Sequence, residues 1–337
     1  MPKVLLTGGS GFIAAHVLEL LLKRGHEVVT TVRSEDKAAK IRAAHPNAKL
    51  TIAIVPDIAQ PGAFDEVAKT PGLEYVEHTA SPFHYNWTDA KTELLDPAIK
   101  GTTSVLEAIK KYAPSVKRVV ITSSFASILS PDGLENPSKT FSEADWNPST
   151  YEEGLTGTKS ISYRVSKKFA EKAGWDFVER EKPNFDLATI CPPLVFGPVV
   201  HHLNSLAAIN TSNERFVQLI QGKWKGEIPP TGVFLWVDVR DVALAHVNAI
   251  ERPEAGGKRF FTTAGKFKNR DLVDLVRKNF PGLAGQLPDD SVKGGDYPEG
   301  GVHGYDNSRA TKVLGIDWIS LEKSVVDTVK SLQEVGA

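Results

Sequence analysis

The chain has 337 residues, of which 41% are hydrophobic and 24% are charged, an ordinary composition for a globular protein. Forty basic and 41 acidic residues leave a formal net charge of −1, which gives no electrostatic reason to bind nucleic acid or an anionic membrane. The single cysteine, Cys191, excludes an intrachain disulfide framework, and no apolar run approaches the ~18–20 residues of a membrane span. We expect a cytoplasmic protein, because the N-terminal MPKVLLTGG also lacks the apolar core of a secretion signal.

Short apolar runs alternate with helical patterns through the first part of the chain. Strands are predicted at 3–7, 27–32, 50–55, 73–79, 118–122 and 185–191, and helices at 12–24, 35–44, 91–112 and about 159–180. The strands are apolar on both faces and alternate with helices. This pattern predicts an α/β fold with a doubly wound parallel sheet that helices cover on both sides.

The first predicted strand runs directly into TGGSGFIA, residues 7–14. Gly8 allows a tight turn, Gly11 lets the backbone approach a pyrophosphate, and Ala14 lets the following helix pack closely on the strand. The helix N-terminus offers free N–H groups and a positive dipole end to phosphates. Because this turn opens a βαβ unit, it predicts a Rossmann-type dinucleotide site; the alternative is a glycine-rich turn without a ligand.

The pattern changes near residue 192, where proline and glycine become frequent and the strands become shorter. We expect residues 1–191 to form the dinucleotide-binding Rossmann domain. Residues 192–233 and 253–337 would form a smaller C-terminal substrate lobe. Residues 234–252 are expected to return to the main sheet as a strand and a helix.

The residues after the second strand indicate which nicotinamide cofactor binds. An acidic residue about 20 positions after the glycine turn would hold the ribose 2′-hydroxyl of NAD. Here the strand ends at Arg33, whose guanidinium can hold a 2′-phosphate as a bidentate fork, and Lys37 adds a second cation. The sequence therefore favours NADPH/NADP⁺; in the alternative interpretation, Arg33 and Lys37 belong only to a solvated helix start.

Tyr163 is the only tyrosine with a lysine four residues later, at Lys167, and on a helix this spacing puts both side chains on one face. Alone the pair is weak evidence, because such spacing is common. An apolar stripe on the same helix is predicted from Val165, Phe169, Ala173 and Phe177. The pair lies roughly 120° from the centre of that stripe and would flank the packed face, where it could border a cleft.

Ser123 and Ser124 follow the apolar strand 118–122, at the sheet edge where ligands of such folds bind. A serine hydroxyl can donate to a carbonyl oxygen that gains negative charge, and a tyrosine can protonate that oxygen. A lysine cation ~5 Å away would supply about 3 kcal/mol toward lowering the tyrosine pKa. The pattern predicts reduction of a carbonyl without a metal, since the nine histidines form no closed ligand cluster.

These elements together resemble the extended short-chain dehydrogenase/reductase family, and the branch of dihydroflavonol, cinnamoyl-CoA and fungal methylglyoxal reductases in particular. The resemblance covers nearly the whole chain. The matching segments are TGGSGFIA (7–14), TVRS (31–34), HTASPF (78–83), VVITSS (119–124), YRVSK (163–167), CPPLVFGP (191–198), WVDVRDVA (236–243) and DNSRATKVLG (306–315).

The resemblance implies an NADPH-dependent aldehyde or ketone reductase with three catalytic residues: Ser124 rather than Ser123, Tyr163 as general acid, and Lys167. Substitution of Ser123 by alanine is then expected to matter much less than substitution of Ser124. The expected cofactor-binding residues are Gly8, Ser10, Gly11, Phe12, Ile13, Arg33, Lys37, Asp57, Ile58, Ala80, Ser81, Tyr163, Lys167, Pro193 and Val195. The candidates for the substrate pocket are Phe83, Phe125, Phe196 and His201.

Two other functions compete with this one. A nucleotide-sugar epimerase or dehydratase of the same extended family is the first, although dehydratases place an acidic pair after the catalytic serine or threonine, where this chain has Phe125, Ala126 and Ser127. The second is a non-catalytic NADP-binding sensor, but such proteins usually lack the Tyr/Lys pair. The expected partner is a small carbonyl compound, and the sequence leaves a monomer or a homodimer equally open.

Overall fold

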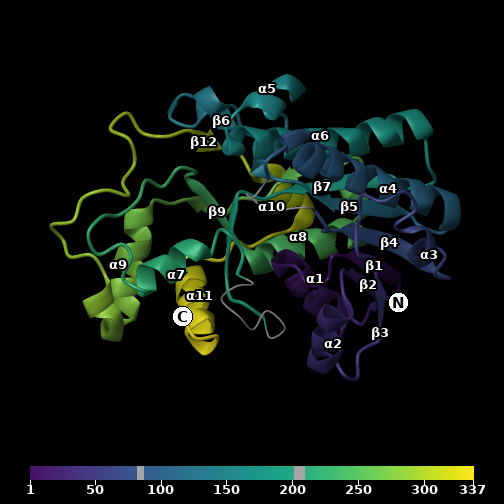
Figure 1. Ribbon diagram of the computed structural model, residues 1–337, viewed down its shortest axis with the longest axis horizontal. Helices are drawn as coiled ribbons and strands as arrows, with labels where there is room; N and C mark the ends of the chain where they lie inside the picture. The colour runs from purple at the N-terminus through teal and green to yellow at the C-terminus, as the bar shows by residue number, and fades with distance from the viewer. Residues whose placement is uncertain (82–86, 201–208) are drawn as a thin grey trace.

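The computed structural model of the protein describes residues 1–81, 87–200 and 209–337, and a parallel sheet forms its centre (Figure 1). The seven strands of this sheet are β1 (Lys3–Thr7), β2 (Glu27–Val32), β3 (Leu50–Ile54), β4 (Leu73–His78), β5 (Arg118–Thr122), β7 (Asp186–Cys191) and β10 (Lys258–Phe261). Their order is β10-β7-β5-β4-β1-β2-β3, and all neighbours pair in parallel. The order reverses between β1 and β4, and in doubly wound folds ligands bind at the carboxyl ends of the strands at such a point.

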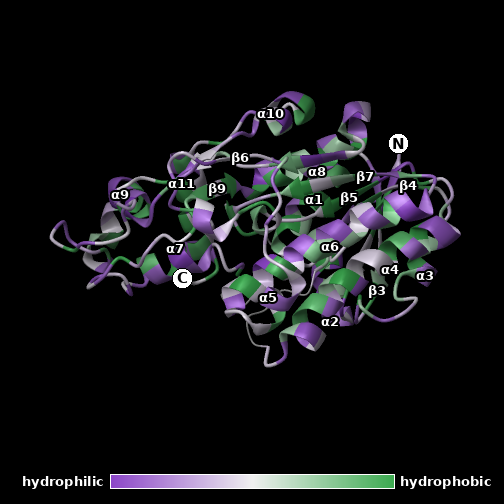
Figure 2. Cartoon of the chain, turned by 90° about the horizontal axis from the view of Figure 1, so that it is seen from above, coloured by the Kyte–Doolittle hydropathy of each residue, from purple (hydrophilic) through white to green (hydrophobic). Residues whose placement is uncertain are grey.

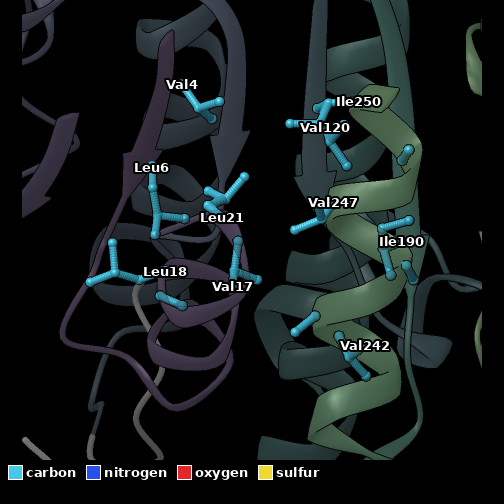
Figure 3. Packing of buried hydrophobic residues seen from close by; sticks show 14 of the residues in the cluster. Val4, Leu6, Val17, Leu18, Leu21, Val120, Ile190, Val242, Val247 and Ile250 are labelled. Carbon is cyan, nitrogen blue, oxygen red and sulfur yellow. The ribbon is translucent and has the colours of Figure 1, made fainter. Parts of the chain in front are cut away.

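Side chains along each strand point alternately to the two faces of the sheet, so each strand contributes apolar side chains to both faces. In β1, Val4 and Leu6 belong to one hydrophobic cluster, whereas Leu5 belongs to the cluster on the other face. Figure 3 shows Val4 and Leu6 beside the apolar side of α1, and Val120 of β5 beside Ile250. The continuous apolar runs of the sequence are therefore strands covered on both sides.

Two layers of helices cover the sheet. The first face packs against α1 (Phe12–Lys23), α2 (Glu35–Ala44), α8 (Val239–Glu251) and α10 (Ser308–Leu314). The second face packs against α3 (Asp65–Ala68), α4 (Asp96–Tyr112) and α6 (Lys159–Glu181), and α5 (Tyr151–Thr156) lies against α6. In Figure 2, α4, α5 and α6 each carry hydrophobic and hydrophilic stretches, as helices with one buried side do.

A smaller lobe lies beside the sheet, and its helices gather on the left of Figure 1. It contains a three-stranded sheet of β8 (Leu194–Phe196), β9 (Leu235–Asp238) and β11 (Gly265–Lys266), together with α7 (Glu214–Ile220), α9 (Asn269–Asn279) and α11 (Leu321–Glu334). A separate hydrophobic cluster forms its core. Two short strands, β6 (Thr140–Phe141) and β12 (Gly304–Tyr305), pair in parallel outside both sheets.

The predicted Rossmann-type fold and its strands are confirmed, with differences of one residue at most at the strand ends. The predicted helix 91–112 is divided into a π-helical segment, Lys91–Leu95, and α4. Pro97 lies in the first turn of α4, and it has no N–H with which to continue a regular ladder from the preceding turn.

One prediction about the lobe is wrong. The strand at the start of 234–252, β9, pairs with β8 and β11 and does not join the main sheet; only the helix α8 returns. The strand that does join the main sheet is β10, from the part of the chain assigned to the lobe, and it pairs with β7. Among the helices in the described ranges, none combines the length and the apolar character needed to cross a membrane.

Candidate active site

The turn after β1 requires glycine at two positions. Gly8 has φ +72°, and a Cβ there would lie 2.9 Å from the Cα of Ala80. A Cβ at Gly9 would lie 2.2 Å from the hydroxyl oxygen of Thr30. The sequence predicts the tight turn at Gly8, but the need for glycine at Gly9 depends on Thr30, which the fold brings beside it.

The hydroxyl of Thr7 joins the carboxyl ends of β1 and β4. It accepts from the backbone N–H of Ala80 at 3.2 Å and lies 2.9 Å from Nδ1 of His78. Burial lowers the pKa of His78 to about 3, so the ring is neutral. The neutral ring can accept from this hydroxyl or donate to it through Nδ1. Sequence reasoning missed Thr7 and His78.

The residues of this edge fit an NADP-type dinucleotide. No side chain caps α1 at Gly11, and its first turn has no acidic residue, so nothing of like charge opposes a pyrophosphate there. Glu35, the nearby acid, forms an ion pair with Arg42. Among the described residues, neither Arg33 nor Lys37 has an ion-pair partner, and Arg33 is exposed. Both cations are therefore free to hold a 2′-phosphate.

Asp57 and Ile58 form the turn after β3. The Asp57 carboxylate accepts from the Ala59 N–H and the Gln60 amide, both at 2.9 Å, and these hydrogen bonds lower its pKa. The carbonyl of Ile58 accepts from Ser104 at 3.0 Å. The turn is thus held in place by its own side chains and α4, with the exposed Asp57 at the surface where the adenine is expected.

Ser124 follows β5 and caps the 3-10 helix η2 (Phe125–Ser127). Its hydroxyl oxygen accepts from the Ala126 N–H at 3.1 Å, which leaves the hydroxyl proton for a ligand. Ser123 instead points inward and is 4% exposed, and its hydroxyl bonds to the carboxylate of Glu171. The expectation that Ser123 can be replaced without much effect neglected this buried contact.

Tyr163 and Lys167 lie one turn apart on α6. Thr158 caps the N-terminus of this helix, because its hydroxyl oxygen accepts from the Ile161 N–H. The Lys167 ammonium donates to the backbone carbonyl of Thr122, at the carboxyl end of β5, over 3.1 Å. In addition, α6 packs against η2. The structure therefore brings the Tyr/Lys helix to the same strand end as Ser124, as the sequence pattern predicted.

The buried face of α6 differs from the predicted stripe. Val165 and Phe177 are buried, but Phe169 and Ala173 are only half-buried. The rest of the buried face consists of Ser162, Ser166, Ala170, Glu171 and Gly174. A Cβ at Gly174 would lie 3.2 Å from Ile121, so small residues let the helix approach the sheet closely.

A small cavity lies beside Lys167. Its volume of about 10 Å³ is enough for one water molecule, and its lining includes His78, Ala80, Ser81, Thr122 and Lys167. Burial lowers the pKa of Lys167 to about 8, while the charge of Glu171 acts in the opposite direction. The thiol of Cys191 lies near the Glu171 carboxylate, and burial raises its pKa to about 12, so it stays neutral.

The low pKa of Lys167 predicts a pH dependence. Below about pH 8 the ammonium is charged and would make Tyr163 a stronger acid, and above it the charge is lost. We expect kcat/KM for carbonyl reduction to fall as pH rises through about 8, and Lys167→Met to lose that inflection. Steady-state rates from about pH 6 to about pH 9.5 measure this. An inflection that persists in the variant would assign it to another group.

The residues suggested for a substrate pocket are not brought together. Phe125 is 2% exposed and stacks on Phe261 in one hydrophobic cluster, and Phe196 is wholly buried in the lobe core. Their packing argues against the predicted role as pocket walls, because neither ring has a free face. Phe83 and His201 lie outside the described residues.

The remaining cofactor candidates lie along the same sheet edge or in the adjoining lobe. The backbone of Val195 in β8 is held by Ser212 and Asn210, at 3.2 and 2.9 Å. Pro193 directly precedes β8. The other candidates follow β1 or β4, the two strands at which the order reverses: Ser10, Gly11, Phe12 and Ile13 in the turn and the start of α1, and Ala80 and Ser81 after β4. Within the described ranges, no group of three or more His, Cys, Asp or Glu residues is arranged to hold a metal ion.

Comparisons with known proteins identify the family of the chain. The NAD dependent epimerase/dehydratase family matches residues 4–262. Ketoreductase azaE of Aspergillus niger is 48% identical over 98% of both chains, and the putative NADPH-dependent methylglyoxal reductase GRP2 of Candida albicans is 41% identical over 98% of both. The crystal structure of Gre2 with NADPH from Candida albicans superimposes with a TM-score of 0.90, at 36% identity, covering 100% of both chains. The chain therefore belongs to the NAD dependent epimerase/dehydratase family, the extended branch of the short-chain dehydrogenases/reductases.

Proposed function

We propose that the chain is an NADPH-dependent reductase of uncharged aldehydes and ketones. The observation that carries this proposal is the hydrogen bond from Lys167 to the Thr122 carbonyl, which anchors the Tyr/Lys helix beside Ser124. Relatives of nearly equal length are named ketoreductase and NADPH-dependent methylglyoxal reductase, which supports the same substrate class.

NADPH, when bound, supplies the hydride for the carbonyl carbon. Ser124 then donates a hydrogen bond to the carbonyl oxygen, where negative charge develops. Tyr163 gives its proton to that oxygen, and the charge of Lys167 lowers the pKa of the phenol. The cofactor would lie along the glycine turn, with Arg33 and Lys37 at the 2′-phosphate and the Asp57–Ile58 turn at the adenine.

The epimerase and sensor alternatives predict different outcomes in one assay. NADPH oxidation is followed spectrophotometrically with methylglyoxal, aliphatic and aromatic ketones, keto esters, 2-keto acids and UDP-sugars. We expect the uncharged carbonyls to give the highest kcat/KM. UDP-sugars as the best substrates would favour an epimerase, and NADPH binding without turnover of any carbonyl would favour a sensor.

Arg33 is expected to determine the cofactor preference. NADPH should bind at least tenfold more tightly than NADH, about 1.4 kcal/mol or more. Arg33→Asp should reverse this order, because it removes the cation and places a negative charge against the 2′-phosphate. Fluorescence titration with both cofactors measures the effect, and Lys40→Asp on α2 is a control for a general change of charge. Equal affinities in the parent protein would refute the assignment.

The protein is further proposed to act in the cytoplasm, as a monomer or a homodimer, without nucleic acid or membrane partners. Light scattering of the purified protein determines its mass in solution, and fractionation of cells that express it determines its compartment.

A further inference from the structure

Glu171 continues the line of functional residues on α6 by one more turn. Tyr163, Lys167 and Glu171 follow one another at intervals of four, so they share one side of the helix. The Glu171 side chain is fully buried. A buried carboxylate is costly unless it is paired, and neither the family resemblance nor the proposed mechanism gives this one a task.

Both oxygens of the Glu171 carboxylate receive hydrogen bonds from other parts of the chain. The hydroxyls of Ser123 and Ser127 each lie 2.5 Å from Oε2. Oε1 accepts from the Thr189 hydroxyl on β7 at 2.8 Å and from Nε of Arg259 on β10 at 2.7 Å. One carboxylate thus connects α6, the segment after β5, and two strands of the main sheet.

Arg259 keeps this carboxylate ionised. Burial alone would raise the pKa of Glu171, but the charge and hydrogen bonds of Arg259, together with the two serine hydroxyls, outweigh it and lower the pKa. The Arg259 guanidinium is itself fixed by the carbonyls of Glu143 and Asp145, at 2.8 and 2.7 Å. The anion is therefore both permanent and rigidly placed.

Ser123 directly precedes Ser124 in the chain, and Ser127 follows it by three residues. We propose that Glu171 is a positioning residue that clamps the segment 123–127 to α6 and so sets the distance between the Ser124 hydroxyl and the Tyr163 phenol. The inference rests on the proposed function. The Ser124 hydroxyl takes no part in the clamp, since its oxygen accepts from the Ala126 N–H and its proton is left for the substrate. The Ser124 backbone is held by the clamp, because its carbonyl accepts from the Ser127 hydroxyl at 2.8 Å.

A purely structural role makes a different prediction. If Glu171 served only the stability of the fold, weakening its contacts would lower the melting temperature and leave turnover by the folded protein unchanged. A positioning residue changes kcat, because a small displacement of one catalytic group slows the reaction while NADPH binding elsewhere on the sheet edge is kept.

The test compares Ser127→Ala with a control pair at the other end of the same strands. Ser127→Ala removes one hydroxyl of the clamp and leaves the Glu171–Arg259 ion pair. Asp186→Asn weakens the ion pair between Arg118 and Asp186, at the amino ends of β5 and β7. We measure kcat with methylglyoxal, NADPH affinity and melting temperature, and normalise kcat to the folded fraction at the assay temperature.

We expect Ser127→Ala to lower kcat about tenfold, with NADPH affinity within about twofold of the parent. Asp186→Asn should lower the melting temperature and leave kcat within about twofold. Glu171→Gln should lower kcat further. If this variant does not fold, the values of kcat for Ser127→Ala and Ser123→Ala test the proposal in its place. A kcat for Ser127→Ala that equals the control, or losses of kcat and NADPH affinity in parallel, would overturn the clamp.

A second measurement separates this inference from the proposed function. Hydrogen–deuterium exchange of the peptide that contains residues 123–129 should be faster in Ser127→Ala than in the parent or in Asp186→Asn. If the parent reduces no carbonyl, the proposed function fails, and exchange alone decides whether the clamp exists. Unchanged exchange in Ser127→Ala would then reject it.

Discussion

Replacement of Tyr163 by phenylalanine is expected to lower kcat by about 10²–10⁴-fold, the usual effect of losing a positioned general acid. The ring lies in a hydrophobic cluster with Trp87, Leu95 and Val165, and phenylalanine preserves that packing. The melting temperature and the NADPH affinity should therefore stay close to those of the parent. Turnover is measured by NADPH oxidation with the best carbonyl substrate.

Three companion variants control this result. Ser124→Ala should also reduce kcat, because it removes a donor to the developing oxyanion. Lys167→Met should lower activity mainly through the tyrosine, so the double variant with Tyr163→Phe should be little worse than Tyr163→Phe alone. If folded Tyr163→Phe kept more than about a tenth of parental turnover, the general-acid role would be refuted.

The largest expected loss of stability follows from Arg259→Met. The variant leaves Glu171 fully buried without a cation, and removal of one partner of a buried ion pair costs about 3–5 kcal/mol of the free energy of unfolding. Methionine also cannot donate the hydrogen bonds that Arg259 makes to the backbone carbonyls of Glu143 and Asp145. Urea denaturation followed by tryptophan fluorescence measures the change, since Trp146 lies 3.6 Å from the guanidinium.

The double variant Glu171→Gln/Arg259→Met tests the cause. If the loss comes from an unpaired buried charge, neutralising Glu171 should recover a large part of it, because a neutral amide costs less to bury than an anion. Recovery of stability should not restore kcat, as the charged clamp is still missing. A double variant as unstable as the sum of the single variants would show that the two side chains do not interact.

The fold was largely predictable because most strands of the main sheet are buried on both faces. Runs such as RVVIT at 118–122 are apolar almost throughout, without the alternation of apolar and polar residues of a half-exposed strand. Glycines and polar residues separate these runs from the helices. The order of the strands follows from the βαβ connections and their fixed hand. The edge strand β10 escaped prediction because KRFF, at 258–261, is short and begins with two cations.

The proposed catalytic residues can be named from the sequence because their pattern is local: a four-residue spacing, and a serine at a strand end. The residues that hold them cannot. Glu171 appears in the sequence as one of many glutamates on a helix, and its role depends on Arg259, which lies 88 positions later. The burial of Phe125 and Phe196 likewise depends on rings that other segments bring beside them, and no local pattern records such packing.

The placement of β10 has a consequence for synthesis of the chain on the ribosome. Strand β7 forms an edge of the sheet until β10 pairs with it, and β10 follows only after β8, α7, β9 and α8. At about 5–20 residues per second, that edge stays open for several seconds as the nascent chain grows. An unpaired strand edge is a template for aggregation, so chains that stop before residue 258 should need a holding chaperone, whereas full-length chains close their own edge.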